Sequence, residues 1–272
     1  MVFSMVSFML LLLITCFLAF DPHMYESIST EMKMDSKIKS IESLNEISSY
    51  LDSQDTDTLI VFDLDEVLVT TEDPFLRPEL EETFLGCVKE AMTKAIAQSR
   101  QETLHCRLSD CLTNAKRYLL DVESPELIAR LQNANKKVIA LTNHPTGKLG
   151  SVESLQAWKA ESMRSFGFHF AKSFPEMKNG ALSESVLYED GTVFCRGVGK
   201  GVALMQFLSA SGYKPKKVIF IDDLMKNLDE VRQALSAHNI AFEGFYYTKA
   251  KFVVTDDDKQ KVKVQFRYLS ED

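Results

Sequence analysis

Short, nearly all-apolar runs constrain this fold more than any other feature of the sequence. The clearest of them are residues 59–64, 138–141 and 218–221. Segments with helical spacing of apolar residues alternate with these runs. Strands without a polar face are buried on both sides, and their alternation with helices favours a mostly parallel sheet covered on both faces. The sequence therefore predicts a doubly wound, Rossmann-like α/β fold.

The expected helices are marked by apolar spacing and by residues typical of helix ends. Apolar residues from Ile41 to Leu51 recur at helical spacing before the first strand. Ser124, as an N-cap with Pro125 in the first turn, predicts the helix that precedes the second strand. Later helices are expected near 152–166, over 200–211 and across 228–235, and a last strand over 241–247.

Two segments do not fit this alternation. Residues 188–193 predict a β-hairpin with Asp190 and Gly191 at its turn, which we expect to lie apart from the main sheet. Residues 74–123 are too long for an ordinary loop and are rich in helix-forming residues. They therefore predict a small helical insertion, a partial cap over the ends of the strands.

Length and charge limit the class of protein. A chain of 272 residues is long enough for one sizeable core. Its 31 basic and 39 acidic residues give a net charge of −8, so no nucleic-acid binding is expected. The expected organisation is a leader over 1–20, a linker over 21–37 and one domain over 38–272.

The first 20 residues carry no charged side chain and have the Leu-rich centre of a secretory signal peptide. About 20 apolar residues are also enough to span a bilayer. We expect either export, periplasmic or secreted, or a membrane anchor, with membrane contact only through residues 1–20. Two alternatives remain: a true start at Met24 or Met32, and a weak lipoprotein signal ending at Cys16.

The cysteines outside this leader are even in number but sparse. They are Cys87, Cys106, Cys111 and Cys195. A bridge from Cys87 to Cys106 or Cys111 is compatible with an oxidising compartment, but so few cysteines do not build a disulfide fold. Small buried thiols are the favoured interpretation.

Polar residues gather where the predicted strands end, which is where open parallel sheets bind ligands. The residues concerned are Asp63 and Asp65 after the first strand, Thr142 and Asn143 after the second, Asp222 and Asp223 after the third, and Lys200 at a helix start. Several carboxylates beside a hydroxyl and a lysine make a cation site next to an anion site. Such a site suits phosphoryl chemistry.

A carboxylate and a phosphate ester repel each other, so a carboxylate nucleophile needs a metal, and Mg²⁺ prefers oxygen ligands. Asp63 would attack phosphorus. Asp65 would protonate the leaving oxygen and later deprotonate water, with a pKa raised by the neighbouring carboxylates. Thr142 and the backbone N–H of Asn143 would bind a phosphoryl oxygen, and Lys200 would offset negative charge.

These residues resemble the signature of the haloacid dehalogenase-like (HAD) superfamily of aspartate-nucleophile phosphohydrolases. Its four motifs match Asp63 to Val67, Thr142, Lys200 and Asp222-Asp223, in that order. The resemblance covers residues 38–250, and segments 215–228 and 244–247 are most similar to a branch described as a domain of unknown function. It implies a metal site formed by Asp63, Asp65, Asp222 and Asp223.

Two positions depart from the commoner pattern of that superfamily. Asn227 stands where many members have a second acidic residue, and we expect it to hold Lys200 or a metal ligand. Glu66 replaces the commoner glycine, as in members that resemble secreted acid phosphatases. Asp65 argues against carbon–halogen chemistry, because dehalogenases of the superfamily lack an acid there.

The sequence thus predicts a Mg²⁺-dependent phosphomonoester hydrolase that acts on a phosphoester substrate through an aspartyl-phosphate. Phosphotransfer to an alcohol is the neighbouring alternative. An exported binding or effector protein that keeps the fold without turnover is the alternative from another class. The run Gly197 to Lys200 is not a nucleotide-binding P-loop, since Gly201 stands where Ser or Thr is required.

Overall fold

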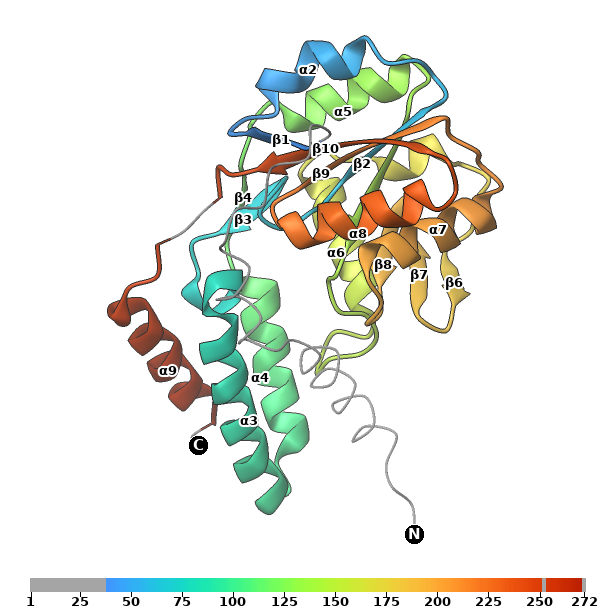
Figure 1. Ribbon diagram of the computed structural model, residues 1–272. Helices are drawn as coiled ribbons and strands as arrows, with labels where there is room; N and C mark the ends of the chain where they lie inside the picture. Colours follow the sequence, from blue (N-terminus) through green and yellow to red (C-terminus); the bar gives the residue numbers. More distant parts are fainter. Residues whose placement is uncertain (1–37, 251–252, 271–272) are drawn as a thin grey trace.

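The computed structural model describes residues 38–250 and 253–270 and has a mostly parallel sheet at its centre (Figure 1). Within the described residues this sheet has eight strands in the order β1-β10-β9-β2-β5-β8-β7-β6. The strands are β1 Ile38–Ile41, β2 Thr58–Phe62, β5 Lys137–Thr142, β6 Gly180–Ser183, β7 Val186–Glu189, β8 Thr192–Cys195, β9 Lys217–Asp222 and β10 Ala241–Tyr247. Taken in this spatial order, neighbouring strands are parallel from β1 as far as β8. Strand β7 pairs antiparallel with β8, and β6 pairs antiparallel with β7 at the edge of the sheet.

Helices cover both faces of the sheet, so the predicted doubly wound α/β fold is confirmed (Figure 1). One face packs against α2 Asn45–Asp52, α5 Ser124–Asn133 and α6 Leu155–Ser165. The other packs against α7 Lys200–Ser211 and α8 Met225–Ser236. Along β2, Ile60 and Phe62 enter the first core, whereas Leu59 and Val61 enter the second. This alternation explains why the strand is apolar throughout.

The hairpin was expected to lie apart from the main sheet, and that expectation is wrong. Strand β8 pairs in parallel with β5, and Leu141 lies opposite Val193. The expected turn is present, with positive φ angles of 47° at Asp190 and 81° at Gly191. Because β8 is buried along its whole length, it has the character of a sheet strand.

Two helix starts also differ from the expectation. Residues 38–41 form edge strand β1, which pairs with β10, so Ile41 belongs to a strand and α2 begins only at Asn45. Ser124 is the first residue of α5, Glu123 takes the N-cap position, and the buried Ser124 hydroxyl has no hydrogen-bond partner within the described residues. Pro125 does lie in the first turn, as predicted.

A separate group of helices lies to one side of the sheet (Figure 1). Residues 74–123 contain α3 Glu81–Ala97 and α4 Gln101–Asn114, placed between β3 Val69–Thr71 and β4 Arg117–Leu119, which pair with each other. Helix α9 Asp256–Ser270, from the C-terminus, packs against them, with the Phe84 and Phe266 rings 5.4 Å apart. We call α3, α4 and α9 the helical subdomain.

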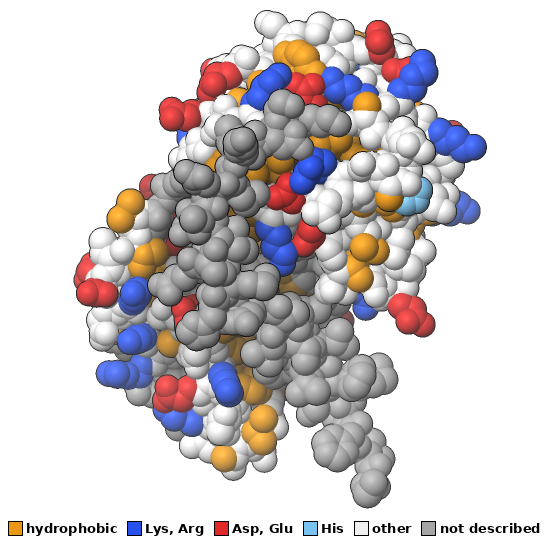
Figure 2. Space-filling view, in the orientation of Figure 1, with side chains coloured by type: hydrophobic (Ala, Val, Ile, Leu, Met, Phe, Trp, Pro, Cys, Tyr) orange, Lys and Arg blue, Asp and Glu red, His pale blue; other side chains and the backbone are white. Residues whose placement is uncertain are grey.

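The surface charges are mixed (Figure 2), and the cysteines of the described residues are not bridged. Acidic and basic side chains lie side by side over the visible face (Figure 2). Cys87, Cys106, Cys111 and Cys195 are free thiols. None of the helices within 38–250 and 253–270 combines the length and apolar character needed to cross a membrane. The predicted leader over residues 1–20 lies outside the described residues.

Candidate active site

Three neighbouring strands bring the predicted site residues to one edge of the sheet. Strand β2 lies between β9 and β5, and all three run parallel. Asp63 follows β2, Asp222 ends β9 and Thr142 ends β5. The backbone N–H of Asp63 donates to the Ile221 carbonyl at 3.0 Å, which fixes Asp63 beside Asp222. The carboxyl edge of the sheet is therefore acidic at its centre.

Three carboxylates converge at this edge. One oxygen atom from each of Asp63, Asp222 and Asp223 lies within 4.8 Å of the others. Lys200 Nζ lies 2.8 Å from Asp63 Oδ2 and 2.8 Å from Asp222 Oδ2. Lys200 is 1% exposed, so this contact takes place away from water. Within the described residues, one lysine thus faces three acids.

Burial and the closeness of the acids disfavour the charged forms of two carboxyl groups in this cluster. Burial raises the pKa of Asp63, although Lys200 opposes the shift. Burial, with Asp63 and Asp222 nearby, also raises the pKa of Asp223. Burial acts against the charge of Lys200, but Asp222 and Asp63 outweigh it and raise the pKa of that lysine. A bound divalent cation would balance the remaining charge, and carboxylate oxygens are the ligands that Mg²⁺ prefers.

Asp222 is held in place by two hydrogen bonds to one oxygen. The Leu224 N–H donates to Asp222 Oδ1 at 2.8 Å, and Asn227 Nδ2 donates to the same atom at 2.9 Å. The sequence left two partners for Asn227, Lys200 or a metal ligand. The structure places its amide on Asp222, a member of the three-carboxylate cluster.

The glycines around Lys200 serve close packing between α7 and α8. A Cβ atom added at Gly201 would lie 2.4 Å from the Glu230 carbonyl oxygen, and one at Gly199 would lie 2.6 Å from Glu230 Oε2. The Lys200 N–H donates to Glu230 Oε2 at 3.1 Å. Glycine therefore lets α7 begin close to α8, which sets the position of Lys200 at the site.

Asp65 lies outside the carboxylate cluster and has a different partner. Its side chain is 43% exposed, and Oδ1 accepts from Lys159 Nζ at 2.5 Å. Burial raises the pKa of Asp65, but the paired Lys159 outweighs burial, so the pKa is lowered. The expectation that neighbouring carboxylates raise the Asp65 pKa is therefore wrong. The predicted metal ligand Asp65 is also not one of the three clustered acids.

Sequence reasoning missed Lys159, although the sequence contained a signal for it. Lys159 lies four residues after Leu155 and four before Met163, and all three are buried on α6. Residues at this spacing share one face of a helix. A lysine on a buried face needs a charged or polar partner, and Asp65 is that partner.

The residues that follow β5 have local contacts. Thr142 is buried, and its Oγ1 accepts from the His144 N–H at 3.1 Å; Asn143 is exposed beside it. The His144 ring lies 5.8 Å from that of Trp158, and burial lowers the His144 pKa to about 4. His144 is therefore neutral near pH 7, as expected of a histidine with a packing role.

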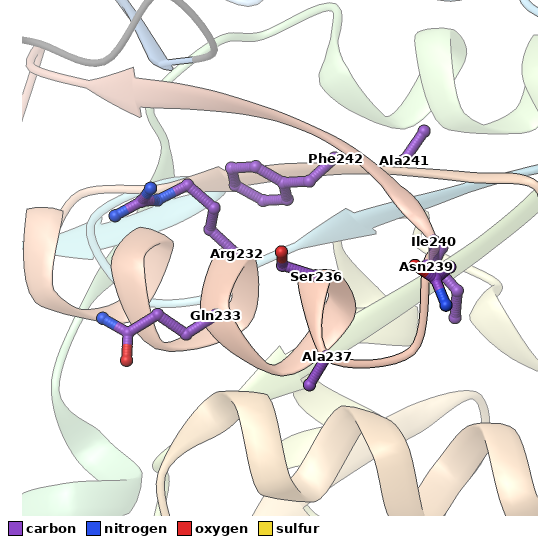
Figure 3. Close-up of a pocket in the computed structure, with 8 residues that line it drawn as sticks. All are labelled: Arg232, Gln233, Ser236, Ala237, Asn239, Ile240, Ala241 and Phe242. Carbon is purple, nitrogen blue, oxygen red and sulfur yellow. The ribbon is translucent and has the colours of Figure 1, made fainter.

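A hollow of about 580 Å³ lies at the opposite edge of the sheet (Figure 3). It is formed by the end of α8 and the start of β10, where Ala241 pairs with Lys217 at the beginning of β9. Arg232 on its wall bonds to Asp229 at 3.0 Å. The hollow therefore lies at the amino ends of the strands, away from the acidic residues.

Fold and site together define a doubly wound α/β protein with a three-carboxylate site at the carboxyl edge of its sheet. Residues 40–271 match the family described as "Protein of unknown function (DUF2608)", and the chain belongs to this family.

The chain is also similar to proteins of two bacterial genera. It is 24% identical over 219 residues to a Chlamydia trachomatis protein named "Putative outer membrane protein". The matched segment covers 79% of this chain and 78% of the relative. A Chlamydia muridarum protein of the same name is 23% identical and covers 85% and 84%. An uncharacterised Rickettsia bellii protein is 23% identical and covers 88% and 82%.

Proposed function

We propose that this protein is a Mg²⁺-dependent phosphomonoester hydrolase of the HAD type. The observation that carries the proposal is the cluster of Asp63, Asp222 and Asp223 around Lys200 at the carboxyl edge of the sheet. Together with Asp65 and Thr142, these residues supply a nucleophile, a cation site and groups for proton transfer. The resemblance of all four motifs supports the same conclusion.

The residues present fit a magnesium ion. Asp63, Asp222 and Asp223 offer oxygen donors close together, and burial with too few positive partners favours a bound cation. Mg²⁺ bound there would neutralise the nucleophile and the phosphate and so reduce their repulsion. Asn227, through its bond to Asp222, would keep one donor carboxylate oriented.

In the first step an oxygen of Asp63 attacks phosphorus, and the bond from phosphorus to the ester oxygen breaks. Because Asp65 is paired with Lys159 and ionised, the required proton enters with the substrate as its phosphate monoanion. It passes through Asp65 to the leaving oxygen. Lys200 contacts the Asp63 carboxylate and stabilises the negative charge that gathers on the transferring group.

In the second step water hydrolyses the aspartyl-phosphate. Ionised Asp65 takes a proton from the water, whose oxygen attacks phosphorus while the bond to Asp63 breaks. Asp63 and inorganic phosphate are the products, and Asp65 returns its proton to solvent. An alcohol in place of water would give phosphotransfer by the same step.

We also propose that the chain is exported or anchored by residues 1–20. The uncharged apolar leader and the names of the two chlamydial relatives support this location. Fractionation of cells that express the full chain tests it, and recovery of the full-length chain in the cytosol would overturn it.

Hydrolysis of an aryl phosphate by the purified chain tests the proposed activity. Turnover should require Mg²⁺ and stop on chelation, and Asp63→Asn should lose on the order of 1,000-fold or more in kcat. Asp57→Asn, a half-buried acid before β2 that pairs with Lys216, is the matched control and should keep full activity.

Activity that survives in Asp63→Asn would overturn the assignment of the nucleophile. Binding of Mg²⁺ without turnover on aryl and alkyl phosphates would favour the exported binding protein instead.

A further inference from the structure

Lys159 is a buried cation that belongs to none of the four predicted motifs. It lies on the inner face of α6 and is 1% exposed. Its Nζ reaches Asp65 Oδ1 at 2.5 Å, and this is its only ion pair within the described residues. Burial of a lysine is costly unless the charge is paired, so the contact with Asp65 is what makes this position tolerable.

Asp65 needs such a partner because its backbone alone does not fix its carboxylate. The loop that carries it is tied by hydrogen bonds from the N–H groups of Leu68 and Val69 to the Leu64 carbonyl, each at 3.0 Å. The side chain itself is 43% exposed and could adopt more than one rotamer. The bond from Lys159 engages Oδ1, and within residues 38–250 and 253–270 no hydrogen bond to Oδ2 is found.

Other cations near Asp65 are held by different groups. Arg117 donates to the carbonyl oxygens of Leu112 and Ala115, and its guanidinium lies 4.9 Å from the centre of the Trp158 ring. Lys200 contacts Asp63 and Asp222. Lys159 is therefore the residue that touches Asp65 directly.

We propose that Lys159 is a positioning residue, which holds one oxygen of Asp65 so that the other faces the phosphoryl group during proton transfer. This inference rests on the proposed hydrolase activity. It assigns to α6, a helix with no motif residue, a direct part in orienting the acid/base group.

Substitution of Lys159 tests the proposal in the full chain. Lys159→Met should lower kcat on the order of 100-fold, the effect of a misplaced reacting group, with a smaller change in KM. Lys159→Arg should recover part of the loss. Lys136→Met is the matched control, since Lys136 is also buried but donates to the Gln54 carbonyl at the opposite edge of the sheet.

A double-mutant cycle separates positioning from a general loss of structure. In an Asp65→Asn background, Lys159→Met should cause no further loss of kcat on a dinitrophenyl phosphate, whose leaving group needs no proton. An equal loss in both backgrounds, or unchanged kcat in Lys159→Met alone, would overturn the proposal. Absence of wild-type turnover would instead count against the hydrolase itself, so the two failures are distinguishable.

Discussion

At the scale of single residues, the site depends on amides and backbone groups that hold its acids. Asn227 donates to Asp222 and is itself 5% exposed. Without this bond, the Leu224 N–H is the one donor that Asp222 Oδ1 keeps within the described residues. The orientation of Asp222, a ligand of the proposed metal site, is thus set by an amide outside the three-carboxylate cluster.

Asn227→Leu should therefore weaken Mg²⁺ binding by roughly 10- to 100-fold, the usual effect of losing a group that orients a ligand. Isothermal titration calorimetry with Mg²⁺ measures this. Asn179→Leu, at an exposed position just before β6, is the control and should leave binding unchanged. Equal affinity in Asn227→Leu and wild type would contradict the role of the amide.

Residues at strand ends were predictable, but the partner of Asp65 was not predicted. Asp63, Asp222 and Lys200 follow from strand ends and a helix start, and the structure brings them into contact. Lys159 lies inside helix α6, and a rule based on polar residues at strand ends does not include helix interiors. The same omission led to the wrong direction for the Asp65 pKa, because like charges were weighed without the lysine.

At the scale of elements, the loop after β2 is linked to the helical subdomain through one buried ion pair. Glu66 has a φ of 60°, a left-handed conformation that glycine adopts more readily than other residues. Its carboxylate accepts from Thr70 Oγ1 at 2.9 Å and from Arg77 Nη1 at 3.2 Å. Arg77 Nη2 also donates to the Ala250 carbonyl at 3.3 Å. The Glu66–Arg77 pair thus joins the turn next to Asp65 to the segment that leads into α3 and, through Ala250, to the segment that precedes α9.

Arg77→Met should destabilise the protein more at pH 8 than at pH 5. Burial raises the Glu66 pKa to about 7 although Arg77 opposes it. An acid with a raised folded-state pKa takes up a proton on folding, so its contribution to stability falls as pH rises from about 4.5 to about 7. Without Arg77 the pKa of Glu66 rises further, so the free energy of unfolding continues to fall at higher pH.

Urea unfolding at both pH values measures this, with a loss of about 3 kcal/mol at pH 8, the cost of breaking a buried pair. Glu66→Gln combined with Arg77→Met should recover part of it. A destabilisation that does not change with pH would count against a charged Glu66–Arg77 pair.

Strands with continuous apolar character could be predicted from the sequence, whereas edge strand β1 and the pairing partner of β8 could not. Strand β2 was predicted from its composition, and both of its faces are indeed covered. Strand β1 was missed because Ile41 and Leu44 happen to be three residues apart, which imitates helical spacing. The place of β8 depends on its pairing with β5, a long-range contact that no local pattern contains.

At the scale of the whole molecule, the helical subdomain is built from two distant parts of the sequence. Helices α3 and α4 come from the insertion, but Phe266 of α9 completes their apolar core together with Met92 and Leu104. Residues 74–123 were predicted to be helical. The contribution of α9 was not predicted, because its apolar residues are few and Phe84, which its Phe266 contacts, lies 182 positions earlier in the sequence (266 − 84).

Phe266→Ala should loosen this subdomain and leave the sheet intact. Truncating a buried phenylalanine costs about 3–5 kcal/mol, which makes opening of the subdomain more frequent by a factor on the order of 100 or more. Limited proteolysis of the α3–α4 connection, residues 98–100, should accelerate accordingly. Val264→Ala, on the exposed side of α9, is the control. Equal cleavage rates in both variants would show that α9 does not stabilise the helices of the insertion.

The two-part origin of the subdomain limits how it can swing relative to the sheet. An insertion tied only by β3 and β4 can turn like a flap on a single ribbon. Here the chain that leaves the sheet after β10 crosses to α9 as a third connection, and Arg77 ties Ala250 at its start. A subdomain joined to the sheet by three chain connections can rotate about fewer axes than one joined by two. The subdomain should therefore keep one position relative to the sheet, which a pair of spectroscopic labels on α3 and α5 would report as a single, narrow distance distribution.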